Sequence, residues 1–209
     1  MALPTTPTLL PVVTAEQRYA AVRVLQWISV AWMSVEVLVS VIAGARAHSV
    51  ALLGFGGDSA IELASAMVVL FRFTGTWLSE RRAAKIAALL LFVLAAFIVA
   101  TSSLSLLGLG PQPTPSYLGI LLLLAAAVVM PWLARRKRKL AQETASSALA
   151  ADAVQSSLCA WMSWIALGGL ALNSLFAIPW ADPAAALLLT PIILKEGREA
   201  WREKACHCC

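Results

Sequence analysis

Apolar and polar positions alternate along this chain in long blocks. Residues 86–134 and 153–181 contain no charged residue, and a membrane-spanning helix needs about 20 apolar residues. All but one of the Lys and Arg residues fall in four clusters, and each interval between clusters is long enough for two spans. The pattern therefore predicts an all-α membrane protein with six helices in three hairpins. The expected spans are 22–44, 50–71, 86–107, 116–134, 145–176 and 182–200.

Helix-breaking residues lie where the outer turns of this scheme are expected. Residues 108–115 contain three prolines and two glycines, and a proline interrupts a helix because it lacks the backbone N–H. Residues 179–183 carry two more prolines and separate the fifth span from the sixth. The small residues Gly168 and Gly169 lie within the fifth span, where we interpret them as positions of close helix packing or of a bend.

The composition agrees with a membrane protein and excludes several other classes. Hydrophobic residues make up 60% of the 209 residues, charged residues 13%, and the mean hydropathy is +0.81. Soluble domains carry about 25% charged residues, so soluble enzymes, disordered chains and secreted disulfide scaffolds do not fit. Residues 1–14 lack the basic start of a signal peptide, so we expect the first span to be retained. We divide the chain into a segment 1–20, a transport domain 21–200 and a tail 201–209.

The four basic clusters also predict the orientation. They lie at residues 18–23, 72–85, 135–139 and 195–204, and the positive-inside rule places them, with both termini, in the cytoplasm. Arg46 is the one basic residue on the outer side. We interpret residues 135–139 as an inner loop that signals orientation or contacts anionic lipid headgroups. A five-residue basic run against a bilayer does not indicate a nucleic-acid partner, and we expect a multi-pass protein of a bacterial inner (plasma) membrane.

Four acidic residues of the predicted spans qualify as residues that line a polar interior. An aspartate at the centre of a membrane helix costs about 2.5–3.5 kcal/mol, so such residues are retained where they line a polar interior. They are Glu36 in the first span, Asp58 and Glu62 in the second, and Asp152 in the fifth.

The spacing of these acids suggests a metal site. Asp58 and Glu62 are four residues apart, so they share a helix face and repel each other unless a cation or protons neutralise them. In the fifth span Asp152, Gln155 and Cys159 also share one face and carry oxygen or sulfur ligands. The alternative is that Gln155 and Cys159 pack between helices, since cysteine is a common buried residue.

Two segments resemble the cation diffusion facilitator, or cation efflux, family. Residues 44–65 include SVALLGFGGDSAIE, which is similar to the family's second-helix signature, with Asp58 and Glu62 at the ligand pair. Residues 151–159, ADAVQSSLC, resemble the fifth-helix element A-D-A-x-H-x-x-x-D, with Gln155 at the His and Cys159 at the Asp. Asp182-Pro183 resembles the D-P opening of the sixth helix.

The resemblance implies export of a divalent transition metal in exchange for protons, through a site between the second and fifth helices. It implies a metal ion as substrate, no prosthetic group and a homodimer. The departures from the family pattern are Gln155, a poor ligand, and Cys159, a soft one, so we expect zinc, cadmium or a softer cation. The family's usual cytosolic C-terminal domain has no counterpart before Cys209, and we expect a short branch that lacks it.

Three further features are left with alternatives. The last residues are Cys206, His207, Cys208 and Cys209. They are interpreted either as a reduced or lipid-bearing tail or as a capture site for a soft cation at the cytosolic mouth. Glu36 is a candidate proton carrier or fourth ligand, or else pairs with a neighbouring Ser or Arg. His48, in the outer turn, is a candidate exit-side contact or a solvent-exposed residue.

Two other functional classes remain open from the sequence. The first is a membrane metal sensor or accessory protein, which binds at the same site but transports nothing. The second is an intramembrane enzyme with Cys159 as nucleophile and Asp152 as its orienting acid. The predicted spans contain no histidine base, which the usual activation of a cysteine requires, so we expect no enzyme activity.

Overall fold

The computed structural model describes residues 15–74, 80–109 and 112–202, and within them the fold is entirely helical. The six helices are α1 (Ala15–Ala47), α2 (Val50–Thr74), α3 (Glu80–Leu106), α4 (Tyr117–Thr144), α5 (Ser147–Phe176) and α6 (Ala181–Trp201). Five of them are long and apolar enough to cross a membrane. The sixth, α6, falls short by composition because four charged residues crowd its last two turns. The prediction of an all-α, six-helix membrane protein is confirmed.

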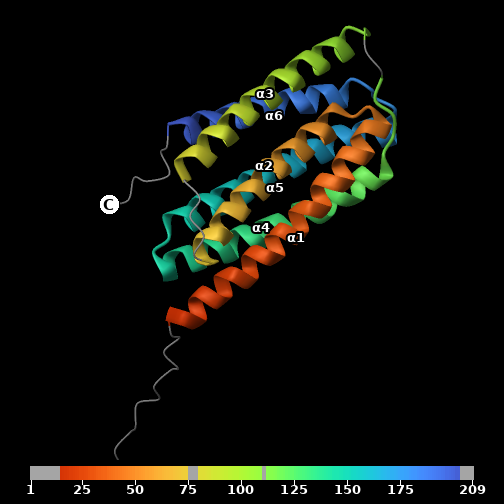
Figure 1. The fold of residues 1–209 in the computed structure, drawn as a ribbon. Coiled ribbons are helices and arrows are strands. Elements are labelled where there is room, and N and C mark those ends of the chain that lie inside the picture. Colours follow the sequence, from red (N-terminus) through yellow and green to blue (C-terminus); the bar gives the residue numbers. More distant parts are fainter. Residues whose placement is uncertain (1–14, 75–79, 110–111, 203–209) are drawn as a thin grey trace, which may run out of the picture.

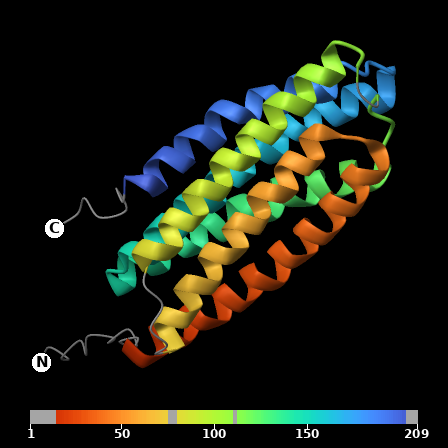
Figure 2. The same cartoon turned by 45° about the horizontal axis from the view of Figure 1, so that its top comes forward.

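The helices form one elongated bundle in which consecutive helices run in opposite directions (Figures 1 and 2). α1, α2, α5 and α4 contact each other in a ring, and α3 and α6 pack together along one side of it. α2 has a central place because it contacts α1, α3, α5 and α6. The start of α1 and the end of α6 lie at the same end of the bundle, as three hairpins require (Figure 2). We call this the terminal end, and its cytoplasmic location stays a prediction.

Local hydrogen bonds fix where several helices begin. The hydroxyls of Ser116 and Ser146 accept hydrogen bonds from backbone N–H groups in the first turns of α4 and α5, which caps donors that a helix leaves unpaired. At the start of α2 a more distant residue is involved. Asp182 of α6 accepts a hydrogen bond from the Ser49 hydroxyl at 2.5 Å and one from the Ala51 backbone N–H at 3.4 Å. This contact holds the starts of α2 and α6 together.

Close packing of α5 against α6 depends on one glycine of a pair. A Cβ atom at Gly169 would lie 2.3 Å from the Cβ of Ala185 and 2.9 Å from the carbonyl oxygen of Ala181. A Cβ at Gly168 would meet no atom within 4 Å. Of the two interpretations of this pair, close packing therefore applies to Gly169.

One predicted boundary is wrong. We expected the fourth span to end at residue 134 and residues 135–139 to form an inner loop, but α4 continues through this run to Thr144. The run is therefore wound around a helix. Four of its residues are exposed, whereas the side chain of Lys137 is fully buried between helices. Its four charged neighbours remain able to act as the predicted orientation signal.

Candidate metal site in the bundle interior

The acids predicted to line a polar interior are all buried in the bundle. The exposed fraction is 0% for Glu36 and Asp152, 1% for Glu62 and 5% for Asp58. Asp58 and Glu62 lie about 12 and 18 Å along α2 from its first residue, near the middle of the helix. Because each carboxylate faces neighbouring helices rather than lipid, the cost of placing it in the membrane is reduced by polar contacts.

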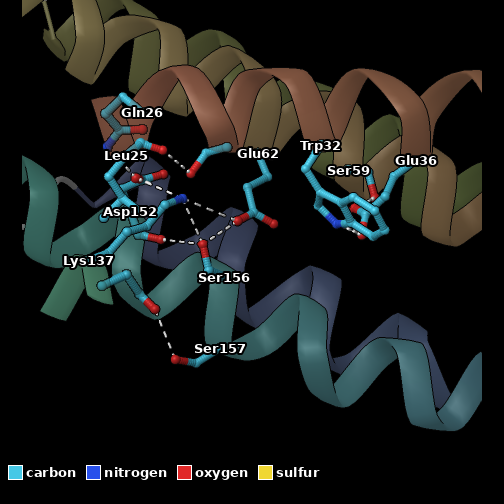
Figure 3. Close-up of polar contacts among 12 residues, drawn as sticks. Leu25, Gln26, Trp32, Glu36, Ser59, Glu62, Lys137, Asp152, Ser156 and Ser157 are labelled. Atoms are coloured by element: carbon cyan, nitrogen blue, oxygen red, sulfur yellow. Dashed lines mark hydrogen bonds and ion pairs between the residues drawn. The ribbon is translucent and has the colours of Figure 1, made fainter. Parts of the chain in front are cut away.

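Lys137 of α4 joins two of these carboxylates (Figure 3). Its ammonium nitrogen lies 2.9 Å from Oδ2 of Asp152 and 3.7 Å from Oε1 of Glu62. It donates a hydrogen bond to the Ser156 hydroxyl at 2.8 Å, and this hydroxyl donates to Oε1 of Glu62. Gln26 of α1 donates to Oδ2 of Asp152 at 2.8 Å. We call these five residues the Lys137 network; they come from α1, α2, α4 and α5.

Glu36 has a separate environment farther along the bundle (Figure 3). Its carboxylate accepts hydrogen bonds from the indole N–H of Trp32 at 2.6 Å and from the hydroxyl of Ser59 at 3.1 Å. Of the partners considered from the sequence, the structure therefore provides a serine of a neighbouring helix. The interaction ties α1 to α2 next to Asp58, and both of these hydrogen-bond donors are neutral.

Asp58 faces a carboxylate that sequence reasoning missed. Glu196 of α6 lies beside Asp58 and is 7% exposed. Neither carboxylate oxygen of Glu196 accepts a hydrogen bond from the residues that the structure describes. Two neighbouring buried carboxylates repel each other when both are ionised, so this pair requires a proton or a cation. Glu196 lies inside the predicted span 182–200, and its charge within a span was the signal that could have identified it.

The remaining candidates on α5 differ in position. Cys159 is fully buried, and its thiol lies beside the carboxylate of Glu62. Gln155 is half-buried and takes no part in the Lys137 network. Ser156, one turn after Asp152 and fully buried, provides the hydrogen bonds instead. From the sequence, nothing distinguished this serine from other small polar residues.

The outermost candidates lie apart from this interior. His48 is exposed at the turn between α1 and α2, with a φ of 52°, and lines a cavity of about 240 Å³ with Gly44, Phe97 and Ser105. Solvent exposure, one of its two interpretations, is therefore what the structure shows. The tail candidates Cys206, His207, Cys208 and Cys209 lie outside the described residues.

The predicted ligands are close together without forming a finished coordination shell. Within the described part of the chain, no three His, Cys, Asp or Glu side chains are arranged to hold one metal ion. Instead Glu62 has two sets of neighbours: Lys137 with Asp152, and Asp58 with Cys159. Oε2 of Glu62 and Oδ1 of Asp152 are buried and accept no hydrogen bond from described residues. These oxygens are available to a cation.

Comparison with known families identifies the chain. Residues 26–205 match the cation efflux transmembrane domain. The chain belongs to the cation efflux family. As a cation efflux protein it is a multi-pass membrane transporter rather than an enzyme, and metal ions are its substrates. No individual curated protein matches the chain.

Proposed function

We propose that this cation efflux protein exports a divalent transition-metal ion in exchange for protons, through a site between α2 and α5. The observation that carries the proposal is an excess of buried negative charge. Among the side chains whose burial the structure describes, one basic side chain is buried, that of Lys137, against six acidic ones. The six are Glu36, Asp58, Glu62, Asp152, Asp182 and Glu196. Buried carboxylates need a counter-charge, which a metal ion supplies in one state and protons supply in the other.

The ligands that we propose are the oxygens of Asp58 and Glu62, the sulfur of Cys159 and an oxygen of Asp152. The mid-helix positions of Glu62 and Cys159 support a site near the centre of the bilayer, where transporters bind substrate between rocking helices. Carboxylates with a thiolate favour Zn²⁺, Cd²⁺ or a softer ion over Mg²⁺ and Ca²⁺, which prefer shells of oxygen alone. Gln155 is the weakest member of the predicted set because its amide oxygen carries no charge.

Three finer points belong to the same proposal. We infer that the terminal end faces the cytoplasm, since the basic clusters lie on helix ends and turns there. We infer a homodimer in a bacterial plasma membrane from the family resemblance. Exchange for protons follows from the ligand types, because carboxylates and thiols release protons when they bind metal.

A flux assay in proteoliposomes tests the proposal. The full chain is reconstituted, and entry of Zn²⁺, Cd²⁺, Mn²⁺, Mg²⁺ and Ca²⁺ is followed with a trapped metal-sensitive dye. We expect saturable flux of Zn²⁺ and Cd²⁺ that is lost in Asp58→Asn and Glu62→Gln. Glu199→Gln is the matched control, since this α6 carboxylate is exposed and paired with Lys195.

The outcomes separate the classes considered from the sequence. Binding of metal without flux indicates the sensor or accessory protein. Wild-type flux in Asp58→Asn places the site elsewhere in the protein.

A further inference from the structure

Lys137 is the one buried basic residue among the side chains whose burial the structure describes, although it belongs to a run of five basic residues. The neighbouring Arg136 and Arg138 are exposed on α4, and Arg138 donates a hydrogen bond to the Ser157 hydroxyl at the surface. Lys139 is also exposed and pairs with Glu143 one turn later. A basic residue that signals orientation needs no buried partner, so Lys137 has a different role from its neighbours.

The ammonium of Lys137 lies between groups of α2 and α5, as a small bound cation would. It lies 2.9 Å from an oxygen of Asp152 and 3.7 Å from an oxygen of Glu62, and it donates to Ser156 at 2.8 Å. All three groups are fully or almost fully buried. Removing an ammonium and two carboxylates from water is costly unless they neutralise each other, so the three charges are energetically coupled.

The same two carboxylates belong to the ligand set of the proposed function. A metal ion that uses Asp152 and both oxygens of Glu62 must compete with the ammonium for Oδ2 of Asp152 and Oε1 of Glu62. The lysine side chain can withdraw, because its charge is carried on a flexible stem of four carbons. Oε2 of Glu62 remains able to bind a cation meanwhile, since it has no hydrogen-bond partner among the described residues.

We propose that Lys137 is a tethered competing cation, which neutralises Asp152 and Glu62 when no metal is bound and is displaced when a divalent ion binds. This inference rests on the proposed function. It makes Lys137 a specificity-determining residue, because a divalent ion gains about twice the Coulomb energy of a monovalent one at the same distance. A monovalent ion would merely replace one single positive charge with another. The returning ammonium also helps the site to release its metal.

The test compares wild type, Lys137→Met and Lys139→Met as full-length purified proteins. Cd²⁺ binding is measured by titration calorimetry, and initial Cd²⁺ flux is measured in proteoliposomes over a range of concentrations. We expect Lys137→Met to bind Cd²⁺ at least about tenfold more tightly, because a nearby like charge has been removed. Its maximal flux should fall at the same time, since release is slower. Lys139→Met, the matched surface control, should keep wild-type values.

If Lys137 competes with the metal, Lys137→Met should lower both the KM and the maximal flux. If Lys137 has only a structural role, the variant should lower flux without tightening Cd²⁺ binding. Lys137→Gln is the second neutral variant, because its amide still donates to Asp152 if the methionine variant does not fold. Wild-type Cd²⁺ affinity in either folded variant overturns the inference, and so does failure of both to fold, which would make Lys137 a structural ion pair. If wild type itself neither binds nor transports Cd²⁺ or Zn²⁺, the proposed function fails instead.

Discussion

Substitution of the two adjacent glycines of α5 gives a matched test of the packing described above. A Cβ at Gly169 would lie 2.3 Å from the Cβ of Ala185, whereas one at Gly168 would enter open space. Carbon atoms in contact are normally about 3.5–4.0 Å apart, so Gly169→Ala must move α5 and α6 apart by more than about 1 Å. Overpacking of this kind costs about 1–3 kcal/mol. Gly168→Ala removes the helix penalty of glycine and should stabilise the protein by about 0.5–1 kcal/mol.

The assay is thermal unfolding of the detergent-purified protein, followed by size-exclusion chromatography after heating. We expect the melting temperature to fall in Gly169→Ala and to stay level or rise in Gly168→Ala. Adding Ala185→Gly to Gly169→Ala should restore part of the loss. The restoration is partial because the carbonyl oxygen of Ala181 would still lie 2.9 Å from the new Cβ. Equal melting temperatures for the two single variants would refute the packing argument.

The same variants connect packing to transport. α6 holds the start of α2 through the contact of Asp182 with Ser49, and α2 carries Asp58 and Glu62. A displaced α6 should therefore lower metal flux in Gly169→Ala even below its melting temperature. Gly168→Ala should transport as wild type does.

Three other predictions concern the site and its support. Apparent metal affinity should rise with pH, because protons compete with the metal for carboxylate and thiol ligands. An imposed pH gradient across vesicles should therefore drive metal flux. Metal flux that does not depend on the gradient would indicate a channel or uniporter. Cys159→Asp should move preference in a metal panel from Cd²⁺ or Hg²⁺ toward Zn²⁺ or Mn²⁺, while Cys159→Ala should weaken soft-metal binding most; an unchanged rank order in both would make Cys159 a packing residue. Ser49→Ala should lower stability in thermal unfolding by about 1–3 kcal/mol, because the buried carboxylate of Asp182 loses a donor, and an unchanged melting temperature would show that this contact contributes little.

The sequence predicted the architecture well because charge and hydropathy vary over whole helices. The stretches between basic clusters are each long enough for about two membrane spans, and this alone predicted six helices in three hairpins. The end of α4 could not be predicted in the same way, since a helix that leaves the apolar core has the same basic composition as a loop. The helical backbone through Thr144 distinguishes the two cases, and the contacts of Lys137 with α2 and α5 then show which face of that helix is buried.

The sequence indicated the acidic residues of the candidate site, but it did not indicate the residues that contact them. A carboxylate inside a span is conspicuous, and Glu36, Asp58, Glu62 and Asp152 are all buried as expected. Gln26 and Ser156 are ordinary residues of membrane helices, and only tertiary contacts assign them to the site. Glu196 is different, because its position within a predicted span was a usable signal that the nearby basic cluster obscured.

Because Lys137 is the one buried residue of its basic run, the number of residues that precede it in α4 matters as much as the composition of the helix. Successive residues of an α-helix are turned by about 100°, so deletion of one residue between Pro131 and Arg135 would turn Lys137 outward and Arg138 inward. The number of positive charges, and with it the orientation signal, would not change. The interior would then receive a planar guanidinium that is always charged, in place of a compact ammonium on a flexible stem. Helical phase alone would thus determine which kind of cation the two carboxylates meet.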